Sequence, residues 1–540
     1  MSKSDVVNPF HAGELEVQSR VGINNMVEIA GDFIRDFLPE QHREFHTSLP
    51  FLIVASADAE GKVWVTILEG EDNFIESPDP RNLVLNIELN NSDPLAEKFK
   101  AGVDVGAIGI ELSTRRRNRF NGYIKKNNNQ YSIAISQSFG NCPQNIHPRN
   151  WSRSTVPTGS KVIRSTSLND AQIALIENSD TMFIGSGQFK GKEKNSHGYD
   201  TSHRGGSAGF VKVINNSFIQ IPDYAGNNFF NTIGNLIIDP RVGLLFINFE
   251  NGDLLHITGR ASIDWQGQDT QIRRLINIEI DSVIDRPSAI SLRWTKLQQE
   301  SLELTLIDRQ KESENITSFY FARADGQELK PFKAGQYLPI EIKLADQTNI
   351  LKRYYSLSGS PQCPSHYRIS VKRVNNGCVS SYFHNSLKIG DKIQAQQPAG
   401  NFVIPELTSP LVLVSAGVGL TPLLSMLHSM KGKQSLVWYV HSARNGANHA
   451  LHEEMTKLVE TNKNFRKKIF YTQPDQSDLI NRDFDIKGYI TAEHLLDLDA
   501  GSNAHYMICG PINFITGLSR DLEKMGIADN QIHFEIFGTG

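Results

Sequence analysis

The sequence predicts a multidomain protein that combines β and α/β architecture. The chain has 540 residues, more than one hydrophobic core usually organises. Strand-like apolar alternation extends to about residue 403, and strands alternating with helices follow from residue 409. The strand-rich first half also contains two similar segments. We therefore expect two small barrels first, a third β-barrel next and a parallel sheet with helices last.

The composition is that of a folded enzyme, with 39% hydrophobic and 21% charged residues. A formal net charge of -4 argues against general nucleic-acid binding. No apolar run approaches the roughly 20 residues that a membrane span needs, and the N-terminus lacks an apolar signal core. The predicted location is therefore the cytoplasm. The cysteines lack the close grouping of zinc or iron–sulfur ligands, so we predict no metal site; they are Cys142, Cys363, Cys378 and Cys509.

Two changes of pattern define the predicted domains. A polar stretch near residues 285–300 separates the first half from new strand-like sequence, and the switch to β–α alternation occurs near Ser409. The predicted domains are residues 1–290, 295–405 and 409–540.

The first domain contains a predicted internal duplication, at about residues 45–130 and 180–265. Each copy has a hairpin of apolar alternation, then an Asp-Pro-Arg, then a strand with a related ending. These features stand at residues 51–70, 79–81 and 119–124 in the first copy, and at 181–213, 239–241 and 256–263 in the second. The repeat predicts a pseudo-dimer of two barrels within one chain.

This half resembles the flavin-binding proteins related to pyridoxamine 5'-phosphate oxidase. The resemblance rests on the features above and on STRRRNRFNG (113–122), QSFGNCPQ (137–144), SHRGG (202–206) and GNNFFNTIGNLIIDPRVGLLF (226–246). It implies a duplicated split β-barrel, with FMN at an interface that two chains form in most of the family. The family also has members that bind haem, other flavins or nothing.

An FMN site needs cations or N–H groups for the phosphate and hydrogen bonds for the ring edge. Ser202 and Arg204 offer a hydroxyl and a bidentate donor, and Asn231 and Thr232 can donate along one wall.

A run of arginines provides a second basic feature. On a strand, Arg115, Arg117 and Arg119 share one face. We leave three interpretations open: an anion site, a salt-bridge surface of a dimer, or a solvated basic edge.

The C-terminal half carries five motifs in order: RYYSLS (353–358), GCVSSYFH (377–384), SAGVGLTPLL (415–424), ICGP (508–511) and HFEIFG (533–538). In the first, a strand places Arg353, Tyr355 and Leu357 on one face and Ser356 on the other. Arginine suits a pyrophosphate, an aromatic ring stacks on a flavin and a hydroxyl suits the flavin N5 edge.

The next two motifs suit phosphate groups. Gly377 permits close backbone approach, and a helix that begins near Val379 and Ser380 presents N–H groups to an anion. Further along, glycines permit a tight turn near a dinucleotide, a threonine caps or donates, and a proline fits the first helical turn. These residues are Gly417, Gly419, Thr421 and Pro422.

Residues at the end of the following strand usually meet the adenosine ribose. Ser442 and Arg444 favour a 2'-phosphate and hence NADPH, whereas His441 and Asn445 fit a bare ribose equally well. The choice between NADH and NADPH stays open. His449 and His452 are predicted to lie at the surface.

Together these motifs are similar to the ferredoxin–NADP reductase superfamily, and most of all to the reductase portion of flavohaemoglobins. The resemblance implies that Arg353 binds the FAD pyrophosphate, Tyr355 stacks on the flavin and Ser356 bonds near N5. It further implies that Cys509 and Gly510 lie beside the nicotinamide, that Glu535 approaches the flavin and that Phe537 covers its ring. Ser356, Cys509 and Glu535 are the predicted catalytic residues.

The predicted function is electron transfer from NAD(P)H to FAD, and on to an FMN in the N-terminal half or to an external small molecule or redox protein. The alternative is an FAD reductase that feeds a haem or a carrier protein, with the N-terminal barrel serving only to bind a ligand or partner. His147, His197, His203 and His256 are the candidate haem ligands. A homodimer, the terminal acceptor and the substrate stay open.

Overall fold

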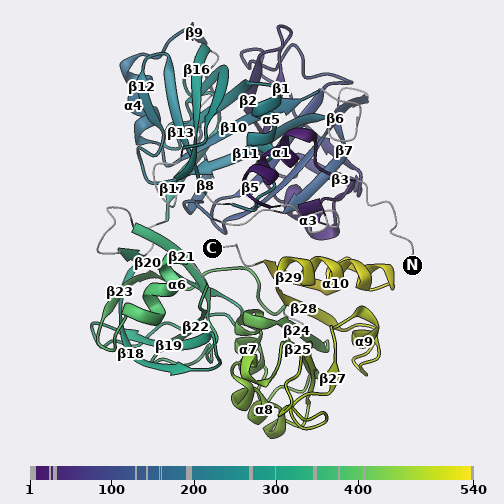
Figure 1. Cartoon of the computed structure of the whole chain (residues 1–540). Helices are drawn as coiled ribbons and strands as arrows, with labels where there is room; N and C mark the ends of the chain where they lie inside the picture. The colour runs from purple at the N-terminus through teal and green to yellow at the C-terminus, as the bar shows by residue number, and fades with distance from the viewer. Residues whose placement is uncertain are drawn as a thin grey trace. The chain divides into compact units, whose positions relative to one another are not determined.

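The computed structural model describes residues 8–23, 26–27, 33–127, 130–140, 144–156, 158–159, 161–189, 197–224, 226–266, 272–297, 300–343, 350–374, 377–405 and 409–536. The chain divides into two compact units, Met1–Leu297 and Gln298–Gly538. Figure 1 shows the strand-rich first unit in purple to teal and the second in green to yellow. No helix in the described ranges is long and apolar enough to cross a membrane.

The first sheet of the N-terminal unit has seven strands in the order β2-β1-β5-β6-β7-β4-β3. In chain order they are β1 (Phe51–Ala57), β2 (Val63–Glu69), β3 (Ile75–Asp79), β4 (Asn82–Leu85), β5 (Asp104–Glu111), β6 (Arg116–Asn127) and β7 (Gln130–Gly140). The predicted hairpin is formed by β1 and β2, paired from Phe51↔Glu69 to Ala57↔Val63.

The second sheet repeats this order as β11-β10-β14-β15-β16-β13-β12, with β9 (Ile163–Ser165) added beside β16. Its strands are β10 (Thr181–Gln188), β11 (Gly198–Gly205), β12 (Lys212–Asn215), β13 (Phe218–Tyr224), β14 (Arg241–Ile247), β15 (Leu254–Asp264) and β16 (Ile272–Arg286). Each strand β1 to β7 thus has a counterpart, from β10 to β16, at the same place in the second sheet.

Strands at the seam between the two sheets are apolar on both faces. Alternate residues of β1 point opposite ways, so Leu52 and Val54 enter the core of the first sheet, whereas Phe51 and Ile53 enter a separate core that also contains Phe183. The second sheet has its own core. The N-terminal unit therefore has three apolar cores: one belongs to each sheet, and the third contains residues of both and holds the two sheets together.

The helices and the remaining strands of this unit cover its edges. They are α1 (Ala12–Arg20), α3 (Glu40–Thr47), α4 (Asp170–Asn178) and α5 (Asn231–Ile238), with the two-stranded sheet of β8 (Arg149–Arg153) and β17 (Leu292–Lys296). α1 and α5 pack so closely that a Cβ on Gly13 would lie 2.1 Å from the carbonyl oxygen of Gly234.

The C-terminal unit begins with an antiparallel six-stranded sheet in the order β21-β20-β23-β18-β19-β22. Its strands are β18 (Ser301–Lys311), β19 (Ile316–Arg323), β20 (Tyr337–Lys343), β21 (Ile350–Ser356), β22 (Tyr367–Lys372) and β23 (Lys392–Gln396). A bridge between Leu357 and Ile369 joins the ends of the sheet into a barrel. The short helix α6 (Cys378–Ser381) follows β22 and continues into a π-helical turn, Tyr382–Ser386.

A parallel sheet in the order β27-β26-β25-β24-β28-β29 completes this unit. Its strands are β24 (Leu411–Ala416), β25 (Val437–Ala443), β26 (Phe465–Tyr471), β27 (Ile486–Lys487), β28 (His505–Gly510) and β29 (Ile532–Ile536). Its helices are α7 (Leu420–Ser429), α8 (His452–Thr461), α9 (Ala492–Leu496) and α10 (Ile512–Lys524). Figure 1 shows α7 and α8 at one side of the sheet and α9 and α10 at the other.

Candidate functional site

A cavity of about 120 Å³ in the N-terminal unit lies between the two repeats. Ser202 and Arg204 of β11 line it, and so do Asn231 and Thr232 at the start of α5. The structure thus brings the four predicted FMN-binding residues together. The volume of the cavity is sufficient for several water molecules or for a phosphate group.

The opposite wall of the cavity comes from the arginine run on β6. Arg117 and Arg119 line it, in keeping with the shared face predicted for alternate strand residues. Arg115 precedes the strand, with φ 61°, and is not part of this wall. Of the three open interpretations, the geometry favours an anion site for Arg117 and Arg119.

Arg119 is a buried cation. The residue is 9% exposed, and among the described residues no hydrogen bond or ion pair reaches its guanidinium; its Nε is buried without an acceptor. Burial, with Arg117 as the second cause, lowers the pKa of Arg119 to about 9. The side chain is still charged near pH 7, so a buried positive charge faces the cavity. An anion bound there would compensate it.

The other two arginines of the lining have partners. Arg117 Nη1 lies 2.9 Å from His203 Nδ1, and burial holds the pKa of His203 well below its ordinary value, so this ring accepts the hydrogen bond. Arg204 Nη1 donates to Asp223 Oδ1 at 2.8 Å. Asp223 also accepts from Arg274 at 2.9 Å, so one carboxylate serves two arginines and the surroundings stay positive.

The first turn of α5 forms the polar end of the cavity. Thr232 and Ser202 share a hydrogen bond of 2.9 Å between their hydroxyls, and Asn231 Nδ2 donates to Glu14 Oε1 at 2.6 Å. Phe230 before the helix has φ 62° and gives no side-chain cap. The first N–H groups of α5 therefore stay available to an acceptor.

In the C-terminal unit, the predicted flavin motif lies at the end of β21. Ser356 is 7% exposed. Tyr355 packs edge-on against Phe383 at 5.5 Å, and burial raises its pKa to about 12. Arg353 donates to the carbonyl oxygen of Lys352 at 2.9 Å, which uses one of its five N–H donors. This set of a guanidinium, an aromatic ring and a hydroxyl fits FAD.

Leu357 directly follows β21 and forms a bridge to Ile369. Its side chain is fully buried in the barrel core, against which Tyr355 also packs. Only the backbone of Leu357 can contact a cofactor.

The predicted phosphate-binding residues of GCVSSYFH (377–384) mainly contact other residues of the protein. Gly377 precedes α6, Val379 is 2% exposed, and Ser380 Oγ accepts from Val374 N at 3.2 Å. A Cβ on Gly377 would lie 2.6 Å from Ser380 Oγ. The glycine therefore leaves room for the serine hydroxyl, which stabilises the local turn.

The two glycines after β24, Gly417 and Gly419, differ in how much space surrounds them. Gly417 has φ 56°, and a Cβ there would meet nothing within 4 Å, so it faces open space. A Cβ on Gly419 would lie 2.2 Å from the Cys509 carbonyl oxygen. Gly419 is therefore required by packing against β28, and its role in a dinucleotide site stays a prediction. Thr421 donates to the Val418 carbonyl oxygen at 3.1 Å, and Pro422 lies in the first turn of α7.

Cys509 and Glu535 are register partners on the neighbouring strands β28 and β29. Cys509 is fully buried, and burial followed by the charge of Glu535 raises its pKa well above the ordinary value. Burial raises the pKa of Glu535 to about 8, and its Oε2 is buried without a hydrogen-bond partner among the described residues. Gly510 follows at the end of β28. Phe537 lies outside the described residues.

At the end of β25, Ser442 is 8% exposed and Arg444 is exposed beyond the strand. His441, by contrast, is fully buried and bonds Ser415 Oγ at 2.8 Å, so it belongs to the core rather than to a ribose site. The surface prediction for His449 is wrong, because the residue is 5% exposed and its Nδ1 bonds the Tyr471 hydroxyl at 3.1 Å.

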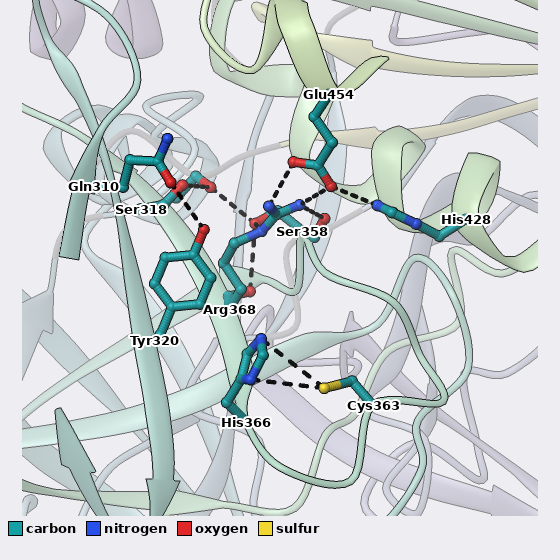
Figure 2. Close-up of polar contacts among 10 residues, drawn as sticks. Gln310, Ser318, Tyr320, Ser358, Cys363, His366, Arg368, His428 and Glu454 are labelled. Carbon is teal, nitrogen blue, oxygen red and sulfur yellow. Dashed lines mark hydrogen bonds and ion pairs between the residues drawn. The ribbon is translucent and has the colours of Figure 1, made fainter. Parts of the chain in front are cut away.

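A charged cluster joins the barrel to the parallel-sheet domain, and the sequence motifs did not include it. Figure 2 shows Arg368 of β22 facing Glu454 of α8, with His428 of α7 on the other side of the carboxylate. Arg368 donates to both oxygens, at 2.6 and 3.0 Å, and His428 Nε2 lies 2.6 Å from Oε1. Burial alone raises the pKa of Glu454, but the bonds from His428 and Arg368 outweigh it and lower the value to about 2. An isolated arginine or glutamate in the sequence gives no signal of such a pair.

Comparisons with known proteins match this unit. Residues 303–404 match the oxidoreductase FAD-binding domain and residues 413–520 the oxidoreductase NAD-binding domain. The C-terminal half thus carries FAD-binding and NAD-binding domains of the ferredoxin–NADP reductase type, and the chain has the fold of an NAD(P)H-dependent flavoprotein oxidoreductase in this half.

Similar proteins include flavohemoproteins of Rhizobium meliloti, 38% identical over 43% of this chain, and of Bacillus subtilis, 37% identical over 44%. The chain spans 59% and 60% of the length of these two relatives. A solved structure, the flavohem-like FAD/NAD binding domain of nitric oxide dioxygenase from Vibrio cholerae, is 32% identical, with a TM-score of 0.40, over 44% of this chain and 98% of that one.

Proposed function

We propose that this protein passes electrons from NAD(P)H through FAD in the C-terminal unit to an FMN in the N-terminal unit, and from there to a small-molecule acceptor. The observation that carries the proposal is the cavity of Arg117, Arg119, Arg204 and the start of α5, because it gathers donors for a phosphate in the unit that lacks the reductase motifs. Bound FAD supplies hydride acceptance and onward electron transfer.

The residues of the C-terminal unit bind and orient the reactants. Arg353 supplies positive charge for a pyrophosphate, Tyr355 a ring surface and Ser356 a hydroxyl at the end of β21. Glu535, with its pKa raised to about 8, keeps its proton near pH 7 and adds no negative charge beside Cys509. The pair Arg368–Glu454 fixes the barrel against the nucleotide-binding domain, which holds the two binding surfaces in register.

In the N-terminal unit, Arg119 and Arg204 provide charge for the FMN phosphate, and the hydroxyls of Ser202 and Thr232 lie beside them. The donor set fits a phosphate ester. Asn231 is oriented by Glu14 and so presents a fixed side chain at the cavity wall.

The likeness to flavohemoproteins favours a second candidate, in which the reductase feeds a haem. Three of the candidate ligands are engaged within the fold: His147 Nε2 bonds the Gly206 carbonyl oxygen at 2.7 Å, His203 bonds Arg117, and His256 Nδ1 bonds the Val65 carbonyl oxygen at 2.8 Å. A metal-ligating histidine commonly makes such a bond through its other ring nitrogen, so these contacts fit a structural role and a haem ligand alike.

Cofactor content tests the proposal. The protein is purified, its ligands are released, and FAD and FMN are separated and compared with protein concentration. One FAD and one FMN per chain supports the relay. FAD alone, after attempted loading with FMN, contradicts it and leaves an FAD reductase with an external acceptor; a Soret band supports the haem candidate.

The Ser356→Ala variant tests the reductase half. Loss of the hydroxyl is expected to slow flavin reduction by NAD(P)H about 100-fold, the order found when one donor at a reacting centre is removed, with FAD content unchanged. Ser360→Ala, four residues along the same segment, is the control. Stopped-flow reduction under anaerobic conditions measures both, and equal rates would contradict the role of Ser356.

A further inference from the structure

The two repeats of the N-terminal unit are equivalent down to their irregularities. Besides the common strand order, each has a register shift at the same place: between Asn121 and Gly122 on β6, and between Thr258 and Gly259 on β15. A Cβ on Gly122 would lie 2.0 Å from the Ala134 carbonyl oxygen, and one on Gly259 would lie 2.1 Å from that of Glu279. Bulges at matching positions support a common origin.

The contacts between the repeats are reciprocal. A Cβ on Gly106 of β5 would lie 2.2 Å from the Tyr199 carbonyl oxygen of β11, and one on Gly243 of β14 would lie 2.7 Å from the Val63 carbonyl oxygen of β2. Since β5 and β2 correspond to β14 and β11, each repeat uses the same surface against the other. This is the arrangement of a two-fold interface, and it creates two equivalent positions in one chain.

The first of these positions is the cavity already described, here called the open position. At its centre, Ser202 bonds Thr232 from the segment that links β13 to β14. Arg117 and Arg119 come from the other repeat. The described lining holds three arginines and one aspartate.

Strand register identifies the residues at the second position. Val54 pairs with Thr66 and Leu52 with Leu68 on β2, as Ile184 pairs with Ser202 and Met182 with Arg204 on β11. In the next strand pair of each sheet, Ile108 of β5 pairs with Arg119 of β6, and Leu245 of β14 pairs with His256 of β15. Two residues further along β5 and β14, Ile110 pairs with Arg117 and Ile247 pairs with Leu254. The second position therefore has Thr66, Leu68, His256 and Leu254 in place of Ser202, Arg204, Arg119 and Arg117.

A carboxylate of the chain itself fills the second position, here called the closed position. Thr66 donates to Asp93, which lies in the segment that links β4 to β5, just as Thr232 lies in the corresponding link. Asp93 also accepts from Arg286 Nη1 at 2.7 Å, and their side chains are 5% and 4% exposed. Burial lowers the pKa of His256 to about 4, so that ring is neutral near pH 7. The closed position is neutral without any ligand.

We infer that the N-terminal unit has one ligand site per chain, at the open position, that this site takes a phosphate ester, and that the Asp93–Arg286 pair occupies the equivalent site. The choice of FMN as the ester rests on the proposed function. The difference between the open and the closed position does not rest on the proposed function, because it follows from the residues that form the two positions.

A phosphate ester suits the open position for physical reasons. A guanidinium offers planar donors that match phosphate oxygens, and the start of α5 adds N–H groups and the positive end of a helix dipole. Without a bound anion, Arg119 has no ion-pair partner among the described residues; the nearby charge of Asp200 compensates it only in part, since burial and Arg117 still lower its pKa, and such a buried charge is unfavourable for folding. The site is therefore built at a cost to stability, as binding sites commonly are.

Ligand titration of the full-length, FAD-loaded protein tests the inference. FMN is titrated and its fluorescence quenching followed, with riboflavin and inorganic phosphate as separate probes. We expect one FMN per chain, and riboflavin weaker than FMN because it lacks the phosphate.

The Arg119→Gln variant identifies the site. It is expected to weaken FMN binding about tenfold to hundredfold, the range for a lost hydrogen bond to a charged group. The same variant should unfold at a higher temperature than the wild type when no ligand is present, because an unpaired buried charge has been removed. Arg260→Gln, at an exposed position of β15, is the control and should change neither measurement.

The outcomes separate the two proposals. Two FMN per chain, or one FMN whose binding is unchanged in Arg119→Gln, overturns the inference and leaves the relay possible. Phosphate binding that depends on Arg119, with no FMN binding, sustains the anion site and overturns the relay. If none of the three probes binds and none raises the unfolding temperature, the inference is overturned.

Discussion

The closed and the open position of the N-terminal unit differ in how they treat buried charge. At the closed position, the carboxylate of Asp93 faces Arg286 at 2.7 Å. At the open position, Arg119 is 9% exposed and no described residue forms an ion pair with it. The same scaffold thus carries one buried charge with an ion-pair partner and one that has none among the described residues. The compensated charge stabilises the architecture, and the uncompensated one indicates where a ligand binds.

The C-terminal unit contains the same contrast. Arg368, Glu454 and His428 compensate one another across the boundary of two domains, whereas the Glu535 carboxyl has one buried oxygen without a described partner and a raised pKa. If this contrast is right, removing a paired charge should destabilise the protein, and removing an unpaired one should stabilise it while impairing function.

The largest effect is expected for Asp93→Asn. The substitution leaves Arg286 buried without its counter-ion, and breaking such a pair typically lowers the free energy of unfolding by about 3 to 5 kcal/mol. Urea denaturation followed by circular dichroism measures it. Asp281→Asn, at an exposed position of β16, should have an effect below about 0.5 kcal/mol. Equal effects of the two variants would contradict a stabilising pair at the closed position.

Glu454→Gln should lower the free energy of unfolding by about 2 kcal/mol near pH 7 and make no difference in strong acid. The pKa of Glu454 is lowered to about 2 from an ordinary 4.5, so its contribution is present above pH 4.5 and is lost as the pH falls toward 2. The difference between wild type and variant should shrink over that range. Its neighbour Glu453, exposed on the same helix, provides the control as Glu453→Gln. A difference independent of pH would show that the effect comes from packing instead.

Glu535→Gln should act in the opposite direction, with an upper limit of about 5 kcal/mol that the partial exposure of the side chain reduces. Because folding raises the pKa of Glu535 to about 8 from an ordinary 4.5, its stabilising contribution is complete below pH 4.5 and is lost as the pH rises to about 8. The variant removes this loss, so it should be more stable than the wild type at pH 8 and equal to it at pH 4. The exposed Glu328 serves as the control, as Glu328→Gln. A variant that is less stable at pH 8 would refute an unpaired carboxyl.

Short motifs predicted the C-terminal unit because each one is a local requirement. A tight turn needs Gly417 with φ 56°, and the start of α7 accepts Pro422 without losing a hydrogen bond. Contacts over long sequence distances were not predictable in this way. The collision of a Gly419 side chain with Cys509 joins residues 90 positions apart, and Arg368 and Glu454 are 86 apart. The surface prediction for His449 was wrong for the same reason, since burial depends on what packs over a residue.

By itself, the sequence determined the elements: the repeated hairpins, the order of the domains and the residue types that suit a flavin and a dinucleotide. Those features depend on alternation, turn geometry and neighbours in the chain, which a sequence displays directly. Only the tertiary structure decided that Arg117 and Arg119 of one repeat lie across a cavity from Ser202 and Arg204 of the other. It alone also decided that Asp93 neutralises Arg286 at the equivalent position. Charge compensation depends on distances between residues far apart in the chain, and those distances are set by how the two sheets pack.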